Sequence, residues 1–293
     1  MIHIVHSGNR HLYRAQIWAM FQERKHVYID DKGWDELMSF SGAEVDDFDD
    51  ERAVYLMALG DRGQLWGAQR VRPTDDRCIL VDKFPHLIGP DQPELKGPEA
   101  WESTRIFTAR GYTGSTPLFP VLALAGAEVA FDAGARRIVA FTDIQNYPHL
   151  TDGAAELALT GLPMAYRYGV MVGMRLEIDE EKLVRMRDSL AEHRRLSYAV
   201  NDEDMEVHGS LPAVQRAVDA ARRIDEWSPR KDLATPIRSI AQIEASYAMY
   251  DGAKLARMAE IASAAAAAAE EARMISPPAR DSGAVVPIKD MVA

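Results

Sequence analysis

The chain has 293 residues, of which 47% are hydrophobic and 27% charged, a balance typical of a globular protein with one or two domains. The formal charge of −11 argues against a nucleic-acid-binding protein, because neutralising phosphates needs a basic face. No apolar run approaches the roughly 18 residues that a membrane span needs, and we expect no secretory signal at residues 1–8. Cys78 is the only cysteine, so an internal disulfide is excluded and a cytoplasmic location is expected.

Hydrophobic spacing predicts the elements of the first half. A short strand covers residues 2–5, and a long helix runs from Arg10 to Tyr28. Residues 29–52 are expected to be a long acidic loop, and residues 53–59 and 64–71 a hairpin. A strand over 101–108 follows. The next helix is predicted to begin with a cap at Ser115 or Thr116, followed by Pro117, and to end near Ala133.

The second half is predicted to continue the sheet and then to become helical. Strands are expected over residues 137–142, 164–168 and 172–178, and helices over 180–196, around 214–224 and over 237–274. Strands alternating with helices indicate an α/β fold. We place a domain boundary at residue 198, with a first domain over 1–198 and a helical C-terminal extension with a flexible tail over 199–293.

Charged and aromatic residues form an ordered pattern between Arg24 and Arg105. An arginine, an aromatic residue four positions on and a tryptophan six further are Arg24, Tyr28 and Trp34. Two aspartates three apart follow in the acidic loop. The remaining members lie in Gly67-Ala-Gln-Arg-Val-Arg-Pro-Thr74, in Lys83-Phe-Pro-His86 and in Trp101-Glu-Ser-Thr-Arg-Ile-Phe107. In order along the chain, these further members are Asp46, Asp49, Arg70, Phe84, Glu102 and Arg105.

The ordered set resembles the acyl-homoserine-lactone synthase, or autoinducer synthase, family over about residues 1–180, and Asn9-Arg-His-Leu-Tyr13 resembles its alphaproteobacterial branch. The resemblance implies a GNAT-like three-layer α/β/α sandwich with a mixed central sheet. It also implies transfer of an acyl group from acyl-CoA or acyl carrier protein to the amine of S-adenosylmethionine. Lactonisation then releases methylthioadenosine and gives a quorum-sensing signal. S-adenosylmethionine is a substrate in this scheme, and neither a cofactor nor a metal is expected.

The resemblance also implies roles for individual residues. Glu102 is the candidate base that takes the proton of the amine. The other catalytic candidates, in an electrostatic cluster, are Arg24, Asp46, Asp49 and Arg105. The candidates for substrate binding are Tyr28, Trp34, Arg70, Phe84, Ser103 and Phe107. Aromatic faces and carboxylates suit a sulfonium cation, and guanidinium groups suit carboxylates.

One geometric requirement follows from the strand over 101–108. Side chains alternate along a regular strand, so Glu102 and Arg105 would point to opposite faces of the sheet. The two residues can share a site only where the strand twists or bulges. We therefore expect an irregularity near Ser103 and Thr104.

Other interpretations remain open for the single features and for the whole. An acidic run is typical of a solvated loop, and Trp34 or Phe84 alone is typical of a core residue. The basic cluster of Arg10, His11, Arg14, Arg24, Lys25 and His26 is either a patch that attracts an acidic acyl donor or solubilising surface charge. The alternatives for function are an N-acyltransferase that forms no lactone and a non-catalytic acyl-thioester-binding protein. The C-terminal helices are a possible homodimer or partner contact.

Overall fold

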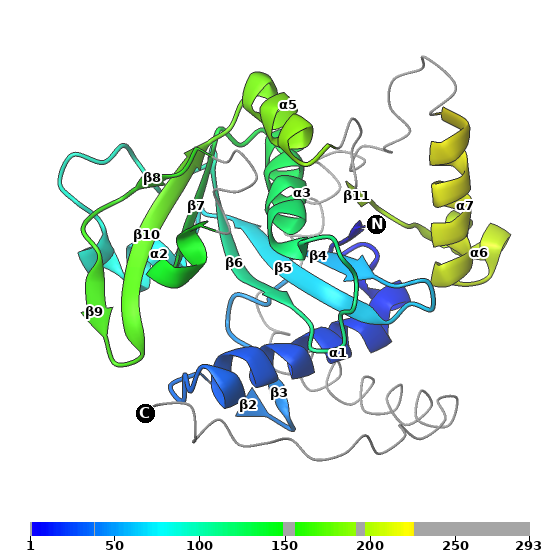
Figure 1. Cartoon of the computed structure of the whole chain (residues 1–293), viewed down its shortest axis with the longest axis horizontal. Coiled ribbons are helices and arrows are strands. Elements are labelled where there is room, and N and C mark those ends of the chain that lie inside the picture. Colours follow the sequence, from blue (N-terminus) through cyan, green and yellow to red (C-terminus); the bar gives the residue numbers. More distant parts are fainter. Residues whose placement is uncertain (1, 38, 149–155, 192–196, 226–293) are drawn as a thin grey trace.

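The computed structural model describes residues 2–37, 39–148, 156–191 and 197–225, which build a mixed central sheet with helices on both faces (Figure 1). The strand order is β11-β1-β4-β5-β6-β7-β10-β8, and β9 pairs with β10. Neighbours are antiparallel except for the parallel pairs β1/β11 and β6/β7. The strands are β1 (Ile2–Val5), β4 (Val54–Leu59), β5 (Leu65–Pro73), β6 (Ala100–Thr108), β7 (Arg137–Asp143), β8 (Ala158–Leu159), β9 (Met164–Tyr166), β10 (Gly169–Glu177) and β11 (Ser197–Tyr198). The predicted α/β class with a mixed sheet is confirmed.

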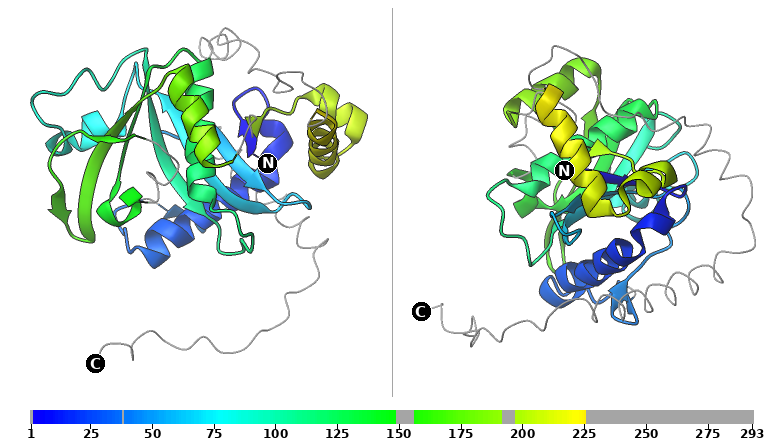
Figure 2. Two further views of the ribbon diagram at one scale, coloured as in Figure 1. Left: turned by 45° about the horizontal axis from the view of Figure 1, so that its top comes forward. Right: turned by 90° about the vertical axis from the view of Figure 1, so that its right-hand side faces the viewer.

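Helices cover the two faces of the sheet and enclose a core on each side (Figures 1 and 2). On one face lie α3 (Leu118–Asp132) and α5 (Glu180–Ser189), and on the other lies α1 (Arg14–Arg24). Almost every residue of α3 is buried, because the sheet covers one side of this helix and α5 the other. The three predicted layers are therefore present.

The first predicted helix is continuous but changes its winding. A 3₁₀ turn (Arg10–Tyr13) leads into α1, and a π-helical segment (Lys25–Asp31) follows it. The loop expected over 29–52 contains a small hairpin of β2 (Ser39–Phe40) and β3 (Ala43–Glu44). The predicted cap of the second helix is wrong. Pro117 occupies the N-cap position of α3, and among the described residues no side chain caps that end.

The sheet opens between β6 and β7. These two strands pair over three positions only, from Ala100↔Arg137 to Glu102↔Val139. Beyond Glu102, β6 continues beside β5, whereas β7 continues beside β10. On one flank of the opening lie α2 (Ile79–Lys83) and the 3₁₀ turn Pro85–Leu87, and the 3₁₀ turn Ile144–Asn146 follows β7. The gap in the ladder leaves space for a cavity at the middle of the sheet.

Residues on both sides of the proposed boundary at 198 pack against the N-terminal part of the chain. The strand β11 pairs with β1 in parallel, and α6 (Asp202–His208) and α7 (Leu211–Asp225) lie near the N-terminus (Figures 1 and 2). Leu211 and Val214 are buried in the same core as Tyr13. The boundary stays a prediction. The helix expected over 237–274 and the tail lie outside the described residues. No helix within the described ranges is both long and apolar enough to cross a membrane.

Candidate active site

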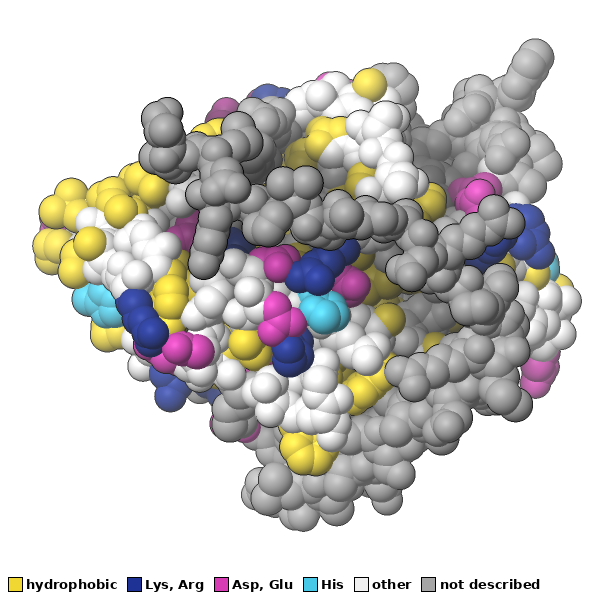
Figure 3. Space-filling view, turned by 60° about the horizontal axis from the view of Figure 1, so that its bottom comes forward, with side chains coloured by type: hydrophobic (Ala, Val, Ile, Leu, Met, Phe, Trp, Pro, Cys, Tyr) yellow, Lys and Arg dark blue, Asp and Glu magenta, His cyan; other side chains and the backbone are white. Residues whose placement is uncertain are grey.

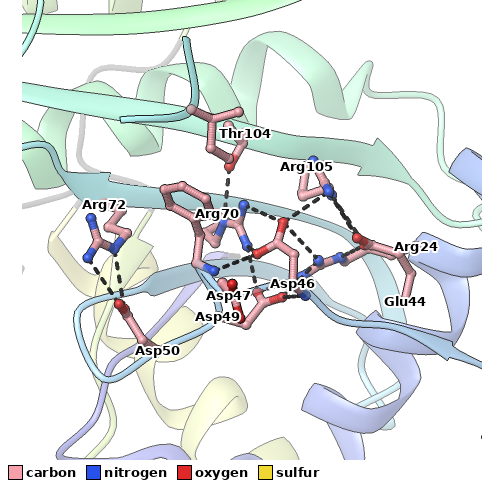
Figure 4. A network of polar contacts seen from close by, with 12 residues as sticks. Arg24, Glu44, Asp46, Asp47, Asp49, Asp50, Arg70, Arg72, Thr104 and Arg105 are labelled. Atoms are coloured by element: carbon pink, nitrogen blue, oxygen red, sulfur yellow. Dashed lines mark hydrogen bonds and ion pairs between the residues drawn. The ribbon is translucent and has the colours of Figure 1, made fainter. Parts of the chain in front are cut away.

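Three arginines and three carboxylates form an ion cluster between α1, β3 with the loop after it, and strands β5 and β6 (Figure 4). Arg24 donates from Nε to Glu44 at 2.6 Å and from both Nη atoms to Asp49 at 2.7 and 2.9 Å. Arg70 binds Asp46 and Asp49, and Arg105 binds Glu44 and Asp46. Each carboxylate thus contacts at least two arginines, and the six formal charges cancel. The acidic loop is therefore not a solvated run at these positions.

Burial and pairing act in opposite directions on the acids of the ion cluster. Burial would raise the pKa of Glu44, but Arg24 and Arg105 hold it down at about 2. Burial likewise opposes ionisation of Asp46, yet Arg70 and Arg105 keep its pKa well below the usual range. The side chains of Arg24 and Glu44 are 1% and 0% exposed. Such groups are tolerated in a protein interior only when every charge has a partner.

A β-bulge brings Arg105 into the ion cluster. Arg70 pairs with Thr104 and Ala68 with Phe107, so two residues of β6, Arg105 and Ile106, oppose one residue of β5. Arg105 has φ +55°, a left-handed conformation that is uncommon for a non-glycine residue. The extra residue shifts the alternation, and the guanidinium reaches Glu44 on the face that carries α1. The expected irregularity of this strand is present, one residue later than predicted.

A cavity of about 310 Å³ lies at the opening between β6 and β7. One half is polar or aromatic, and its lining includes Tyr28, Lys32, Trp34, Thr104 and Arg105. The other half is mostly apolar, and its lining includes Phe119, Ala123, Ile138, Ala140, Met174 and Leu176. Tyr28 and Trp34 stack with ring centroids 5.4 Å apart, and the Arg105 guanidinium lies 5.5 Å from the centroid of the Tyr28 ring. The ion cluster therefore borders the cavity through Arg105.

Glu102 lies beside this cavity but does not line it. Its side chain is buried against the first turn of α2, where its carboxylate accepts the backbone N–H groups of Ile79 and Leu80 at 2.8 and 2.7 Å. The Cys78 thiol donates to the same carboxylate at 3.4 Å. Burial raises the pKa of Glu102, and the two backbone N–H groups oppose that rise. Its strand neighbours Ser103 and Thr104 do line the cavity.

The other predicted site residues divide into two groups. Tyr28, Trp34, Ser103 and Phe107 line the cavity, with the Ser103 hydroxyl accepting from Gln69 Nε2 at 2.6 Å. Arg70 is buried in the ion cluster, and Phe84 packs behind the lining, with its ring centroid 4.6 Å from that of Phe141. The structure therefore brings five of the predicted residues to the cavity wall, since Arg105 also belongs to it.

The prediction of a basic surface cluster near α1 is wrong for one residue, Arg24. Arg24 is buried in the ion cluster and is not part of a surface patch. On the face that carries α1, basic side chains stand beside acidic ones (Figure 3). Lys25 and His26 both contact Asp30, at 2.7 and 2.8 Å. The described part of this face thus has mixed charge.

Several residues of the site were missed from the sequence. Glu44 binds two arginines, and Tyr55 donates to Asp49 at 3.0 Å. Lys32 lines the cavity and faces Asp143 from the other flank. Within the acidic run, no spacing in the sequence distinguishes Glu44 from its neighbours. Among the described residues, no group of three or more His, Cys, Asp or Glu is arranged to hold a metal ion.

Residues 9–186 match the family model described as autoinducer synthase. The isovaleryl-homoserine lactone synthase of Bradyrhizobium diazoefficiens is 27% identical over 194 residues, which is 65% of this chain and 85% of that protein. The acyl-homoserine-lactone synthase of Ralstonia nicotianae is 29% identical over 144 residues, which is 47% of this chain and 70% of that protein.

Comparison with solved structures finds similarity to the same kind of enzyme. A CoA-dependent acyl-homoserine lactone synthase with S-adenosylmethionine and isopentyl-CoA superposes with a TM-score of 0.62 at 27% identity. The match covers 74% of this chain and 98% of that one. A second CoA-dependent acyl-homoserine lactone synthase gives a TM-score of 0.59 at 25% identity, covering 67% of this chain and 98% of that one.

Proposed function

The chain belongs to the autoinducer synthase family and is an acyltransferase, an acyl-homoserine-lactone synthase, and we propose from this premise that it takes its acyl group from acyl-CoA. The support for the donor is the similarity to a CoA-dependent enzyme with isopentyl-CoA, over 98% of that enzyme's length. Acyl carrier protein is the alternative donor. S-adenosylmethionine is the acceptor and is consumed as a substrate.

The observation that carries this function is the two-sided cavity between β6 and β7. An amide-forming reaction on S-adenosylmethionine needs an apolar space for the acyl chain and a polar, aromatic space for a sulfonium cation. The apolar half, with Phe119 and Ile138, suits the acyl chain, and the stacked rings of Tyr28 and Trp34 suit the sulfonium. The thioester carbonyl would then lie where the halves meet, beside the bulge of β6.

The proposed chemistry has two steps. The amine of S-adenosylmethionine attacks the thioester carbonyl, the new C–N bond replaces the C–S bond, and the thiol leaves with a proton. The methionyl carboxylate then attacks the carbon next to the sulfonium and displaces neutral methylthioadenosine, which closes the lactone. The backbone N–H groups of Arg105 and Ile106 are the proposed oxyanion donors, because both residues form the bulge and line the cavity.

Glu102 remains the proposed base. A carboxylate offers about four lone-pair sites. Two backbone N–H groups and one thiol use three of them, which leaves a position for a water that carries the proton from the amine. The raised pKa of the buried Glu102 also makes the group a stronger proton acceptor than an exposed carboxylate. The ion cluster is proposed to fix the bulge and thereby the donors.

The test is a reaction of the purified chain with S-adenosylmethionine and a panel of acyl thioesters, each offered on CoA and on acyl carrier protein. We expect an acyl-homoserine lactone by mass spectrometry, with CoA as the better donor. A chain that acylates another amine and leaves S-adenosylmethionine intact would favour the N-acyltransferase alternative. A cytoplasmic location and a dimer contact through the C-terminal helices stay predictions.

A further inference from the structure

Lys32, in the wall of the cavity, forms a loose ion pair with Asp143, which lies just outside the residues that line it. Lys32 directly follows the π-helical segment after α1 and lines the cavity. Asp143 ends β7 on the opposite flank. The Nζ atom of Lys32 lies 3.4 Å from Oδ2 of Asp143 and 5.3 Å from the centroid of the Trp34 ring. The ion pairs of Arg24 with Glu44 and Asp49 are closer, at 2.6 and 2.7 Å.

Both partners keep hydrogen-bonding capacity beyond the contact between them. The lysine ammonium has three donors, and its side chain is 30% exposed. Asp143 Oδ1 accepts from the Tyr166 hydroxyl at 2.5 Å, which fixes the carboxylate and leaves Oδ2 toward Lys32. Tyr166 in turn packs edge-on against Trp34, with ring centroids 6.4 Å apart. Asp143 is thus held by a second partner, whereas the Lys32 side chain is partly exposed.

Among the described residues of the cavity wall, one other cationic side chain is present, that of Arg105. Its guanidinium is engaged by Glu44 and Asp46, both of which belong to the neutral ion cluster. An incoming carboxylate would have to compete with these two buried acids for Arg105. Lys32 faces a single acid at a longer distance, so it is the cation of this cavity that a substrate carboxylate can engage at lower cost.

We propose that Lys32 and Asp143 bind the amino-acid end of S-adenosylmethionine, with Lys32 on its carboxylate and Asp143 on its ammonium. This inference rests on the proposed function. The amino-acid end is a zwitterion, with a carboxylate that can pair with Lys32 and an ammonium that can pair with Asp143. Binding it therefore replaces one loose ion pair with two. The sulfonium next to the amino-acid end then lies near Trp34, which stands beside Lys32. Holding the carboxylate keeps the nucleophile of the second step close to its target carbon.

A purely structural role for the pair is the alternative that the test must separate. The segment after α1 is also tied to the β9–β10 hairpin, because Asp35 contacts Arg167 at 3.1 Å and the Tyr168 hydroxyl. The loss of Lys32 could therefore loosen this segment and weaken every ligand of the cavity. A useful readout must depend on the amino-acid end alone.

Two nucleoside ligands provide that readout by calorimetry. S-adenosylhomocysteine carries the amino-acid end, whereas methylthioadenosine has the same nucleoside and lacks that end. We expect Lys32→Met to weaken S-adenosylhomocysteine about tenfold or more, the loss of a charged hydrogen bond, and to leave methylthioadenosine within about twofold. Lys32→Arg should restore part of the loss. The matched control is Lys25→Met, which removes a lysine that pairs with Asp30 and does not line the cavity.

Each outcome of the calorimetry either supports or overturns the inference. Equal weakening of both ligands by Lys32→Met would show a structural role and overturn the inference, and so would no change in either ligand. Binding of both ligands by the unaltered chain would keep the proposed function intact in those cases. An unaltered chain that binds neither ligand would instead contradict the proposed function, and the inference would fall with it.

Discussion

Arg24 and Glu44 form a buried ion pair with 2.6 Å between Nε and Oε2, although twenty residues separate them in the chain. The pair joins α1 to the small hairpin of β2 and β3. Arg105 approaches the same carboxylate from the bulge of β6. One acid therefore connects the helix, the acidic loop and the cavity wall, which makes it the most informative position for a stability experiment.

Glu44→Gln is expected to lower the free energy of unfolding by about 3–5 kcal/mol, because it leaves the buried ion cluster with one positive charge in excess. Chemical denaturation measures the change. Asp47→Asn is the matched control, since it removes one acid from an exposed position of the same loop and should cost less than about 0.5 kcal/mol. Equal effects of the two variants would contradict the described ion cluster.

Glu102→Gln should lower kcat by about 10²–10⁴-fold, the usual contribution of a general base. The variant keeps the shape of the side chain against Ile79 and Leu80. Binding of methylthioadenosine, measured by calorimetry, reports whether the cavity is intact. An unchanged kcat in a variant that still binds this ligand would remove Glu102 as the base.

His3 gives the fold a defined sensitivity to acid. Its ring contacts Tyr13, Gln215 and Tyr198, and burial lowers its pKa from 6.5 to about 4. The unfolded chain therefore binds a proton first as the pH falls, so the stability is complete above pH 6.5 and declines toward pH 4. At pH 5 the loss relative to pH 7.5 should be about 2 kcal/mol.

Denaturation of the unaltered chain and of His3→Gln at both pH values checks this contribution. The variant is less stable at pH 7.5, but its loss on acidification should be smaller by about the same 2 kcal/mol. Identical losses on acidification in the two proteins would show that His3 does not titrate between folded and unfolded states as described.

Ala123→Phe should restrict the acyl donors that the enzyme accepts. Ala123 lies one helical turn after Phe119 on α3, and both line the apolar half of the cavity. A phenyl ring there fills space that an acyl chain needs, so kcat/KM should fall most for the longest accepted acyl-CoA. Binding of methylthioadenosine in the polar half should stay the same. A uniform loss for all chain lengths would place the acyl chain elsewhere.

The sequence supported the fold and much of the site because those features are local or ordered along the chain. The β4–β5 hairpin was predicted from its strands and from Asp61-Arg62-Gly63, where Gly63 adopts φ +77°. Arg24, Asp46 and Asp49 were expected to share an electrostatic cluster, and they do. The need for a bulge near Ser103 followed from side-chain alternation alone.

Other features depend on long-range packing, which no spacing reveals. Glu44 looks like part of a solvated acidic run until Arg24 and Arg105 approach it from two other elements. The π-helical winding after Arg24 and the pairing of β11 with β1 are set by tertiary contacts in the same way. Lys32 and Asp143 are 111 positions apart in the sequence and meet only in the folded chain.

The central claim is that one cavity couples acyl transfer to lactone closure on S-adenosylmethionine. The most direct measurement is a time course with acyl-CoA and S-adenosylmethionine that quantifies free CoA, methylthioadenosine and lactone together. We predict equal amounts of all three products throughout the reaction. Release of CoA without methylthioadenosine and lactone would contradict the account.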